Sequence, residues 1–341
     1  MAYTTINKPT DYFNTVLYTG NGSTQSITGI GFQPDWVWIK NRSGTDVHAI
    51  YDSVRGANKN LRSESTAAEG SQSTGLTSFD SDGFAVGDTG SVNTSSNNFV
   101  SWNWLASNTT ASNSNGSITS TVSANTTAGF SIVSFTGTAA NATVGHGLGV
   151  APDCIITKSR VNAENWGFYH QSLGGGKQLE LNTTAAVKTS SAYYNDTSPT
   201  STVFSIGTAD STNDNQNMIA YCFAEKKGYS KIGQYEGNAN ADGTFVYTGF
   251  LPAWVLVKNI DAAENWIIFD NKRPGYNLTD ALLKPSLNNA ESTSGVKFDL
   301  VSNGFKARVS DAEGNSSNTF IYMAFAEHPF VSSTGTPVTA G

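Results

Sequence analysis

Charged side chains are scarce in this sequence of 341 residues, and cysteine is almost absent. Only 14% of the residues are charged, against roughly 25% in ordinary soluble domains. The 20 basic and 27 acidic side chains sum to −7 without any basic cluster, which argues against binding to nucleic acid. Two cysteines exclude a disulfide framework and a structural zinc site, and leave open whether Cys154 and Cys222 pair.

Long apolar runs are also lacking. No run approaches about 18 residues and no basic-then-apolar stretch opens the chain, so we expect neither membrane insertion nor a secretory signal. Ser, Thr, Asn and Gly are abundant instead, and these residues form helices poorly but suit short strands joined by turns. Because the chain exceeds the size of one hydrophobic core, the composition predicts a β-rich protein of two or three domains.

One pattern of nine residues occurs three times. It reads from Phe32 to Lys40, from Val150 to Lys158 and from Phe250 to Lys258, with a proline six residues before each lysine. A second pattern closes each copy, at 99–106, 218–225 and 320–327. Two patterns in the same order three times indicate three divergent copies of one unit.

Both patterns predict strands. Alternation places Trp36 and Trp38 on one face of the first pattern, with apolar residues on the other face as well. The closing pattern has one face of large side chains and one of small ones, of which Ser101, Ala220 and Ala324 are examples. A large face fills a core and a small face lets another strand come close, which is typical of a packed sandwich. We therefore expect an all-β fold of three tandem β-sandwich units of the jelly-roll type.

The repeats set the expected domain boundaries. Residues 107–129 are rich in Ser, Thr and Asn and are expected to form a linker or a loosely held strand, because they cannot bury enough surface. The full expected order is an N-terminal arm (1–17), repeat 1 (18–106), the linker (107–129), repeat 2 (130–230), repeat 3 (231–330) and a C-terminal tail (331–341).

Candidate catalytic residues recur with the repeats. Twelve residues after the three lysines stand Asp52, His170 and Asp270. The histidines lack metal-ligand spacing, and no nucleophile or phosphate-binding motif is present. Because an enzyme site would not need three partly matching copies, we predict no catalytic residue, no cofactor and no metal site.

Aromatic side chains are the remaining candidates for ligand contact. The recurring tryptophans occupy core-like strand positions, so we interpret them as core residues rather than ligand contacts. Tyr193 and Tyr194 lie in a polar stretch that only the second copy contains, and they are the better candidates for exposed ligand contacts.

Several motifs resemble a repeat family of virion-associated proteins from marine tailed bacteriophages. They include 31–40, Asp52 to Gly56, Phe79 to Phe84 and Tyr221 to Glu225, and the resemblance covers nearly the whole chain. The second copy departs from it, with Cys154 where the other copies have tryptophan. The resemblance implies a concanavalin-like or jelly-roll fold, no enzymatic activity and a place in the virion, after assembly in the cytoplasm of the host bacterium.

Two functions follow from this resemblance. The first is a structural and adhesive component of a tail appendage, tail fibre or receptor-binding tip; the alternative is a capsid decoration protein. A third hypothesis, from another class, is a glycan-binding or glycan-degrading module. The expected partners are other virion proteins and a host surface glycan, and we expect a homo-oligomer or many copies in the particle.

Overall fold

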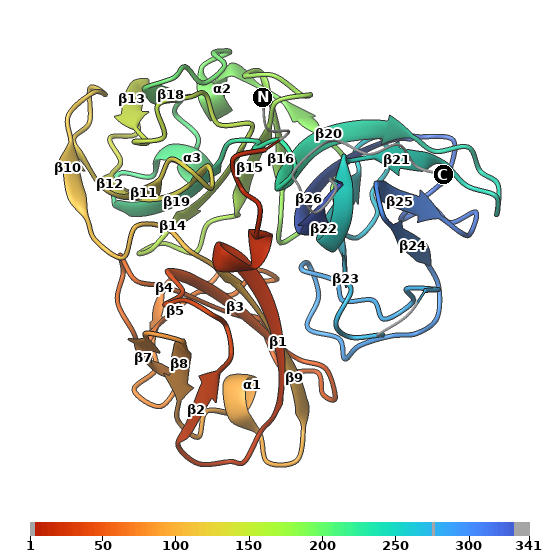
Figure 1. Ribbon diagram of the computed structural model, residues 1–341. Helices are drawn as coiled ribbons and strands as arrows, with labels where there is room; N and C mark the ends of the chain where they lie inside the picture. Colours follow the sequence, from red (N-terminus) through yellow and green to blue (C-terminus); the bar gives the residue numbers. More distant parts are fainter. Residues whose placement is uncertain (1–3, 275–276, 331–341) are drawn as a thin grey trace.

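Strands dominate the computed structural model, which describes residues 4–274 and 277–330. Helix in this part of the chain is limited to four short pieces: η1 (Pro9–Asp11), α1 (Gly90–Asn93), α2 (Ser191–Tyr194) and α3 (Asp210–Asn213). The expectation of an all-β fold is confirmed. None of these helices has the length and apolar character that a membrane crossing requires. Figure 1 shows the strands gathered into three lobes.

Each lobe is one continuous segment of the chain. The N-terminal segment (13–104) has β1 (Phe13–Thr19), β9 (Asn98–Trp104), β3 (Trp36–Asn41) and β4 (Ala49–Asp52) in one sheet, β2 (Gln25–Thr28), β8 (Gly83–Val86) and β7 (Leu76–Asp80) in a second, and the pair β5 (Lys59–Asn60) and β6 (Gly70–Ser71).

The middle segment (111–223) has the widest sheet. Its strands, in order across the sheet, are β10 (Ala111–Asn113), β11 (Ser120–Asn125), β12 (Phe130–Thr136), β19 (Asn217–Phe223), β14 (Cys154–Ser159), β15 (Gly167–His170), β16 (Lys177–Glu180) and β17 (Lys188–Thr189). A separate pair joins β13 (Ala142–Gly145) to β18 (Val203–Ile206).

The C-terminal segment (230–329) again has two sheets. The larger contains β20 (Ser230–Glu236), β26 (Thr319–Pro329), β22 (Phe250–Asn259) and β23 (Ile267–Asp270), and the smaller contains β21 (Phe245–Tyr247), β25 (Gly304–Ala307) and β24 (Phe298–Val301).

The same four-strand order occurs in all three segments. It runs β1-β9-β3-β4, then β12-β19-β14-β15, then β20-β26-β22-β23. The register repeats too, with residues of the two sequence patterns paired as Trp36 with Trp104, Cys154 with Phe223, and Trp254 with Phe325. The positions aligned by sequence are therefore the positions aligned by strand pairing.

Some expected boundaries cut through strands. The arm expected over 1–17 overlaps β1, which begins at Phe13 because that ring is buried in the core. The linker expected over 107–129 contains β10 and β11, and β11 joins the middle sheet with Val122 buried. The tail expected over 331–341 lies outside the described residues.

The large faces of the three sheets meet at the centre of the molecule. They form one hydrophobic cluster to which all three segments contribute. Ring contacts between segments, given as centroid distances, are Trp36 with Tyr221 at 4.7 Å, Trp104 with Trp254 at 5.5 Å, and Phe223 with Phe325 at 5.9 Å. The core that these faces fill is thus shared between lobes.

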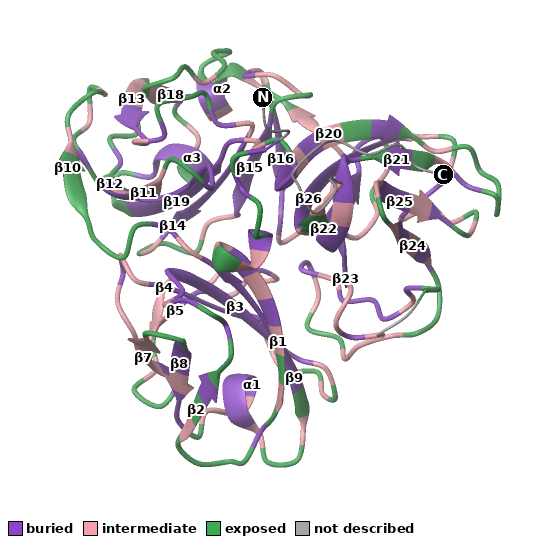
Figure 2. Ribbon diagram, viewed as in Figure 1, coloured by how far each residue is buried: buried purple, intermediate pink, exposed green. Residues whose placement is uncertain are grey.

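The small faces pack inside each lobe. Ala220 and Cys222 face Phe204 of the β13–β18 pair, and Ala324 packs with Phe305 of β25. Small side chains let the second sheet approach closely, as the sequence pattern predicted. Figure 2 shows the long strands mostly buried and the exposed residues concentrated in loops.

Candidate functional site

The three positions that the repeat singles out lie at the ends of equivalent strands. Asp52 ends β4, His170 ends β15 and Asp270 ends β23, and all three side chains have no exposed surface. They do not converge on one another. Each instead contacts a different neighbouring segment. We name the three contact regions by the segments that they join: Asp52 lies at the N/M junction (N-terminal and middle), His170 at the M/C junction (middle and C-terminal), and Asp270 at the C/N junction (C-terminal and N-terminal).

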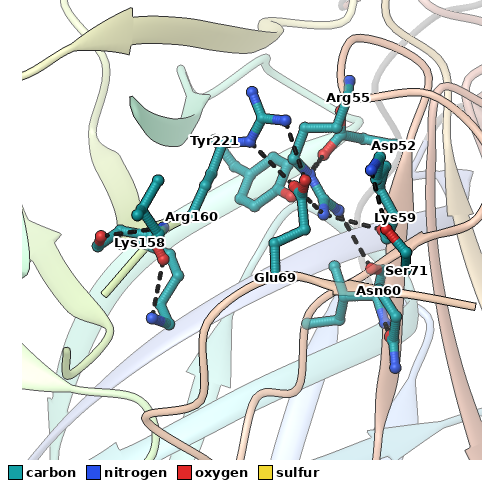
Figure 3. Close-up of polar contacts among 12 residues, drawn as sticks. Asp52, Arg55, Lys59, Asn60, Glu69, Ser71, Lys158, Arg160 and Tyr221 are labelled. Atoms are coloured by element: carbon teal, nitrogen blue, oxygen red, sulfur yellow. Dashed lines mark hydrogen bonds and ion pairs between the residues drawn. The ribbon is translucent and has the colours of Figure 1, made fainter. Parts of the chain in front are cut away.

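At the N/M junction, Asp52 joins two segments. The hydroxyl of Tyr221, on β19, donates to Asp52 Oδ2 at 2.7 Å. Arg55 donates to the same carboxylate through its backbone N–H and its Nε, and this side chain too is fully buried. Burial raises the pKa of Tyr221, so the phenol stays protonated and remains a donor. Figure 3 shows these side chains pointing toward one another.

Glu69 extends this network to a second arginine. It accepts from Arg160 of the middle segment at 2.9 and 3.0 Å and contacts Arg55 at 3.2 Å. Its backbone N–H also donates to the Arg160 carbonyl at 2.9 Å. Burial opposes ionisation of Glu69, but the hydrogen bond from Arg160 and the charge of Arg55 outweigh burial and lower its pKa. Glu69 is therefore a charged bridge between two arginines.

The C/N junction repeats the arrangement. Trp102 Nε1 donates to Asp270 Oδ2 at 2.9 Å, and Arg273 donates to the same oxygen at 2.7 Å. Glu291 accepts two bonds from Arg42 at 2.8 Å and contacts Arg273 at 3.1 Å. Its backbone N–H donates to the Arg42 carbonyl at 2.9 Å. The C/N network thus has the same arrangement as the N/M network: Trp102, Asp270, Arg273, Glu291 and Arg42 take the places of Tyr221, Asp52, Arg55, Glu69 and Arg160.

The M/C junction keeps the backbone bond but has apolar side chains. The Val187 N–H donates to the Ile260 carbonyl at 2.9 Å, in the places that Glu69 and Arg160 occupy at the N/M junction. Leu173 stands three residues after His170, where the other copies have arginine, and it packs on the central cluster. Met323, at the position of the two donors Trp102 and Tyr221, lines a narrow apolar gap beside His170.

Neutral histidine fits this apolar junction. His170 Nδ1 accepts the Ser172 N–H at 3.2 Å, so Nε2 carries the proton and faces the Tyr322 carbonyl at 3.4 Å. Burial lowers the pKa of His170 to about 4. An aspartate here would have no arginine or hydroxyl partner, which explains why the second copy of the motif has histidine at this position.

A second set of ring nitrogens crosses the same junctions. The ring eight residues after each repeated lysine donates to a backbone carbonyl of the next segment: Trp166 to Arg62 at 2.9 Å, Trp266 to Glu180 at 3.0 Å, and His48 to Lys284 at 3.1 Å. His48 can donate from Nε2 because Trp38 Nε1 donates to its Nδ1 at 2.9 Å. Burial lowers the pKa of His48 to about 3, so this ring also stays neutral.

The equivalent side-chain contacts across the three junctions follow one order around the molecule. Side-chain donors at equivalent positions reach from the middle segment to the N-terminal segment, from the N-terminal to the C-terminal segment, and from the C-terminal to the middle segment. The backbone N–H groups of Glu69, Glu291 and Val187, and Nε2 of His170, donate across the same junctions in the opposite direction. Contacts that run head to tail and close after three steps form a ring. One chain thus contains a closed three-membered ring of similar lobes.

The repeated lysines bond mainly to loops of their own lobe, and Lys258 also donates to the Thr184 carbonyl of the middle segment at 3.1 Å. Lys40, Lys158 and Lys258 are fully buried, and each Nζ donates to loop carbonyls after its strand, such as Gly44 at 3.2 Å and Asn162 at 3.3 Å. Burial lowers the pKa of each of the three to about 8. These lysines organise the loops that carry the junction residues.

The two tyrosines expected as exposed ligand contacts differ in position. Tyr194 is 1% exposed and packs edge-on against Tyr169, so it is not an exposed contact. The short helix α2, capped by Ser190, turns this ring under the surface. Tyr193 is half-buried and packs against the same cluster.

The other residues that the sequence singled out are structural. The tryptophans interpreted as core residues are buried, which confirms that interpretation: Trp36, Trp102, Trp166, Trp254 and Trp266. Cys154 and Cys222 are free thiols on adjacent strands, and they face different clusters on opposite sides of the sheet. Within residues 4–274 and 277–330, no three acidic, histidine or cysteine side chains are grouped as a metal ion would need.

A hollow of about 410 Å³ in the C-terminal segment is lined by the acids Glu264, Asp311 and Glu313. Glu313 accepts from Lys284 and Asn265, and Asp311 accepts the Glu313 N–H. At least two of its three carboxylates therefore already have protein partners.

Sequence reasoning found Asp52, His170 and Asp270 but missed what they bind. Arg55 and Arg273, three residues after the two aspartates, were a visible signal of local ion pairs. Glu69 and Arg160 gave no such signal, since 91 positions separate them.

Comparison with known proteins places the chain in a family. No curated protein and no solved structure matches it. The family model described as "Domain of unknown function (DUF7483)" matches residues 8–329, a span that includes every junction residue described above. The chain therefore belongs to the DUF7483 family.

Proposed function

We propose that this chain is a non-enzymatic structural protein of a bacteriophage virion surface, working as part of a tail appendage or receptor-binding tip. The observation that carries the proposal is the use of the candidate catalytic residues. Asp52 and Asp270 are buried and saturated by arginine, tyrosine and tryptophan donors, so their charge holds segments together. A carboxylate in that state has no free face for a substrate.

Three tandem β-sandwich units of the jelly-roll or concanavalin-like type are the fold we propose for this function. The repeated strand order and the repeated register support it. We take the units to begin at β1, β12 and β20, with β10 and β11 added to the middle one. A ring closed within one chain is compact and rigid, which suits a part that must survive outside the cell.

The partners we propose are other virion proteins and a surface glycan of the host, with many copies in the particle. Assembly in the bacterial cytoplasm agrees with two cysteines that remain free thiols. The motifs shared with virion-associated repeat proteins support the setting.

Particle labelling tests the proposal. An antibody raised against the purified chain is applied to intact particles and imaged by electron microscopy, with particles from an unrelated phage as control. Label at the tail supports the proposed function, and label over the capsid supports the decoration alternative. Protein found in the infected cell but absent from purified particles would overturn both.

An activity assay distinguishes the structural proposal from the glycan-degrading alternative. The purified chain is incubated with bacterial polysaccharide and peptidoglycan, and we expect no released reducing ends or fragments. Turnover that disappears on changing Asp52, His170 or Asp270 would replace the structural proposal with a glycan-degrading one.

A further inference from the structure

One strand of the C-terminal segment exposes two aromatic rings side by side. On β21, Phe245 is 45% exposed and Tyr247 is 55% exposed, whereas Val246 between them is buried. They are the two aromatic members of the exposed large apolar side chains in the described part of the chain. Alternate residues of a strand lie about 7 Å apart on the same face, so the two rings form a short row.

The fold does not need these aromatics. In the N-terminal segment, the strand β2 has Ser26 and Thr28 around the buried Ile27, at the positions of the two rings around Val246. In the middle segment, β13 has Thr143 and Gly145 around the buried Val144. Equivalent strands thus form the same pairing with small or polar residues, and the aromatic row is specific to the C-terminal lobe.

A glycine lies opposite the row on the next strand, β25. Gly304 pairs with Tyr247, and a Cβ added there would lie 3.1 Å from the Phe245 ring and 2.0 Å from the Val246 carbonyl. Gly83 makes the same close approach to the Ile27 carbonyl in the N-terminal segment, so the glycine belongs to the strand pairing and the two rings alone distinguish this face. Figure 1 shows β21, β25 and β24 on the outer side of the C-terminal lobe, away from the central core.

Charged groups border the row in balanced pairs. Lys306, the cross-strand partner of Phe245, binds Asp242 at 2.6 Å. Arg308 contacts Asp299 at 3.3 Å. Two cations against two anions give no net charge, so the face favours neither a polyanion nor a polycation, while it still offers donors and acceptors to hydroxyl groups.

We propose that the outer face of the sheet β21–β25–β24 is a binding site for a neutral saccharide. Pyranose rings would stack on Phe245 and Tyr247, because sugar C–H groups are attracted to the negative face of an aromatic ring. Their hydroxyls would bond to Lys306, Asp242 and Asp299. The inference rests on the proposed function, for which it supplies the chemistry of the receptor, but binding belongs to the purified chain and needs no particle.

The chain itself supplies the variant that tests this site. Phe245→Ser combined with Tyr247→Thr copies Ser26 and Thr28 of β2, so the strand pairing is preserved and the rings are removed. The matched control is Val161→Ser, which removes a side chain of similar exposure (47%) from a loop of the middle segment. Circular dichroism and the melting temperature check that both variants fold.

Binding is measured by calorimetry and by retention on immobilised polysaccharide. The neutral probes are dextran, mannan and galactan, and the acidic probes are alginate and hyaluronan. We expect binding to at least one neutral probe, weakened about tenfold or more in the double variant and unchanged in the control.

Three results would overturn the site. They are binding to none of the neutral probes, binding that the double variant retains, and binding to the acidic probes alone. Sedimentation of the wild-type chain is a fourth test, since a dimer that the double variant abolishes would show that a second copy covers the rings. A negative binding result would not change the outcome of particle labelling, so the saccharide site and the proposed function can be disproved independently.

Discussion

The hydroxyl of Tyr221 donates to the carboxylate of Asp52 across 2.7 Å, although 169 positions separate the two residues. Trp102 stands in the same relation to Asp270, and Met323 stands beside His170. Donor and acceptor change together: an aromatic donor meets an aspartate with an arginine partner, and methionine meets a neutral histidine. The three copies therefore differ in a concerted way, since the residues on the two sides of each junction match each other.

Removing the Tyr221 hydroxyl isolates one bond of the N/M junction. Tyr221→Phe leaves Asp52 and Arg55 buried with one donor fewer, and we expect it to lower the free energy of unfolding by about 2 kcal/mol. The matched control is Tyr229→Phe, since Tyr229 is equally buried but its hydroxyl has no hydrogen-bond partner among the described residues. Urea unfolding followed by circular dichroism measures both, and equal losses would contradict the junction role of Tyr221.

Stability should fall in mild acid. The folded-state pKa values of His48 and His170, about 3 and about 4, lie below the unfolded value of about 6.5. The unfolded chain therefore binds more protons between pH 4 and 6.5, so the free energy of unfolding rises with pH through this window.

His170→Gln tests the share of one ring. Glutamine keeps a donor for the Tyr322 carbonyl but does not titrate. In the variant, the slope of unfolding free energy against pH between pH 5 and 6 should decrease by about 1 kcal/mol per pH unit. An unchanged slope would mean that His170 is already protonated in the folded protein.

A larger side chain on one of the small faces should lower the free energy of unfolding, because the two sheets of the lobe are in close contact there. Ala324 is fully buried against the smaller sheet, so Ala324→Leu should destabilise the protein by about 1–3 kcal/mol through overpacking. Ala263→Leu, on an exposed loop residue, is the control and should change the melting temperature little. A well-tolerated Ala324→Leu would show that the two sheets are not in close contact.

The sequence predicted much of the fold because its repeats are local patterns. The alternation in 36–39 and 99–106 identified buried strands and their large and small faces, and the strand pairing agrees with the alignment. Alternation shows that a face is buried but not what covers it. The large faces were therefore expected to fill a core, without any sign that Trp36 would stack on Tyr221 of another segment.

The site was harder to predict for a related reason. Asp52, His170 and Asp270 stood out by position, but the partners that join the two aspartates to other lobes, Tyr221 and Trp102, are 169 and 168 positions away, and contacts at such separation leave no local pattern. Tyr194 was misjudged because polar neighbours suggested exposure, whereas α2 folds its ring inward. The exposed pair Phe245 and Tyr247 escaped notice, since alternation alone does not say which face of β21 is outside.

The most direct test of the junctions exchanges one for another. The M/C set is transplanted into the N/M junction as Asp52→His, Arg55→Leu, Glu69→Val, Arg160→Ile and Tyr221→Met, and the free energy of unfolding is compared with that of Asp52→Ala alone. Asp52→Ala leaves Arg55 buried without its main partner and should cost about 3–5 kcal/mol, whereas a complete apolar set in place of a buried ionic network is often nearly neutral. We expect the variant with all five substitutions to be folded and more stable than Asp52→Ala. If the five-substitution variant is unfolded, or less stable than Asp52→Ala, the residues of each junction do not act as one interchangeable set.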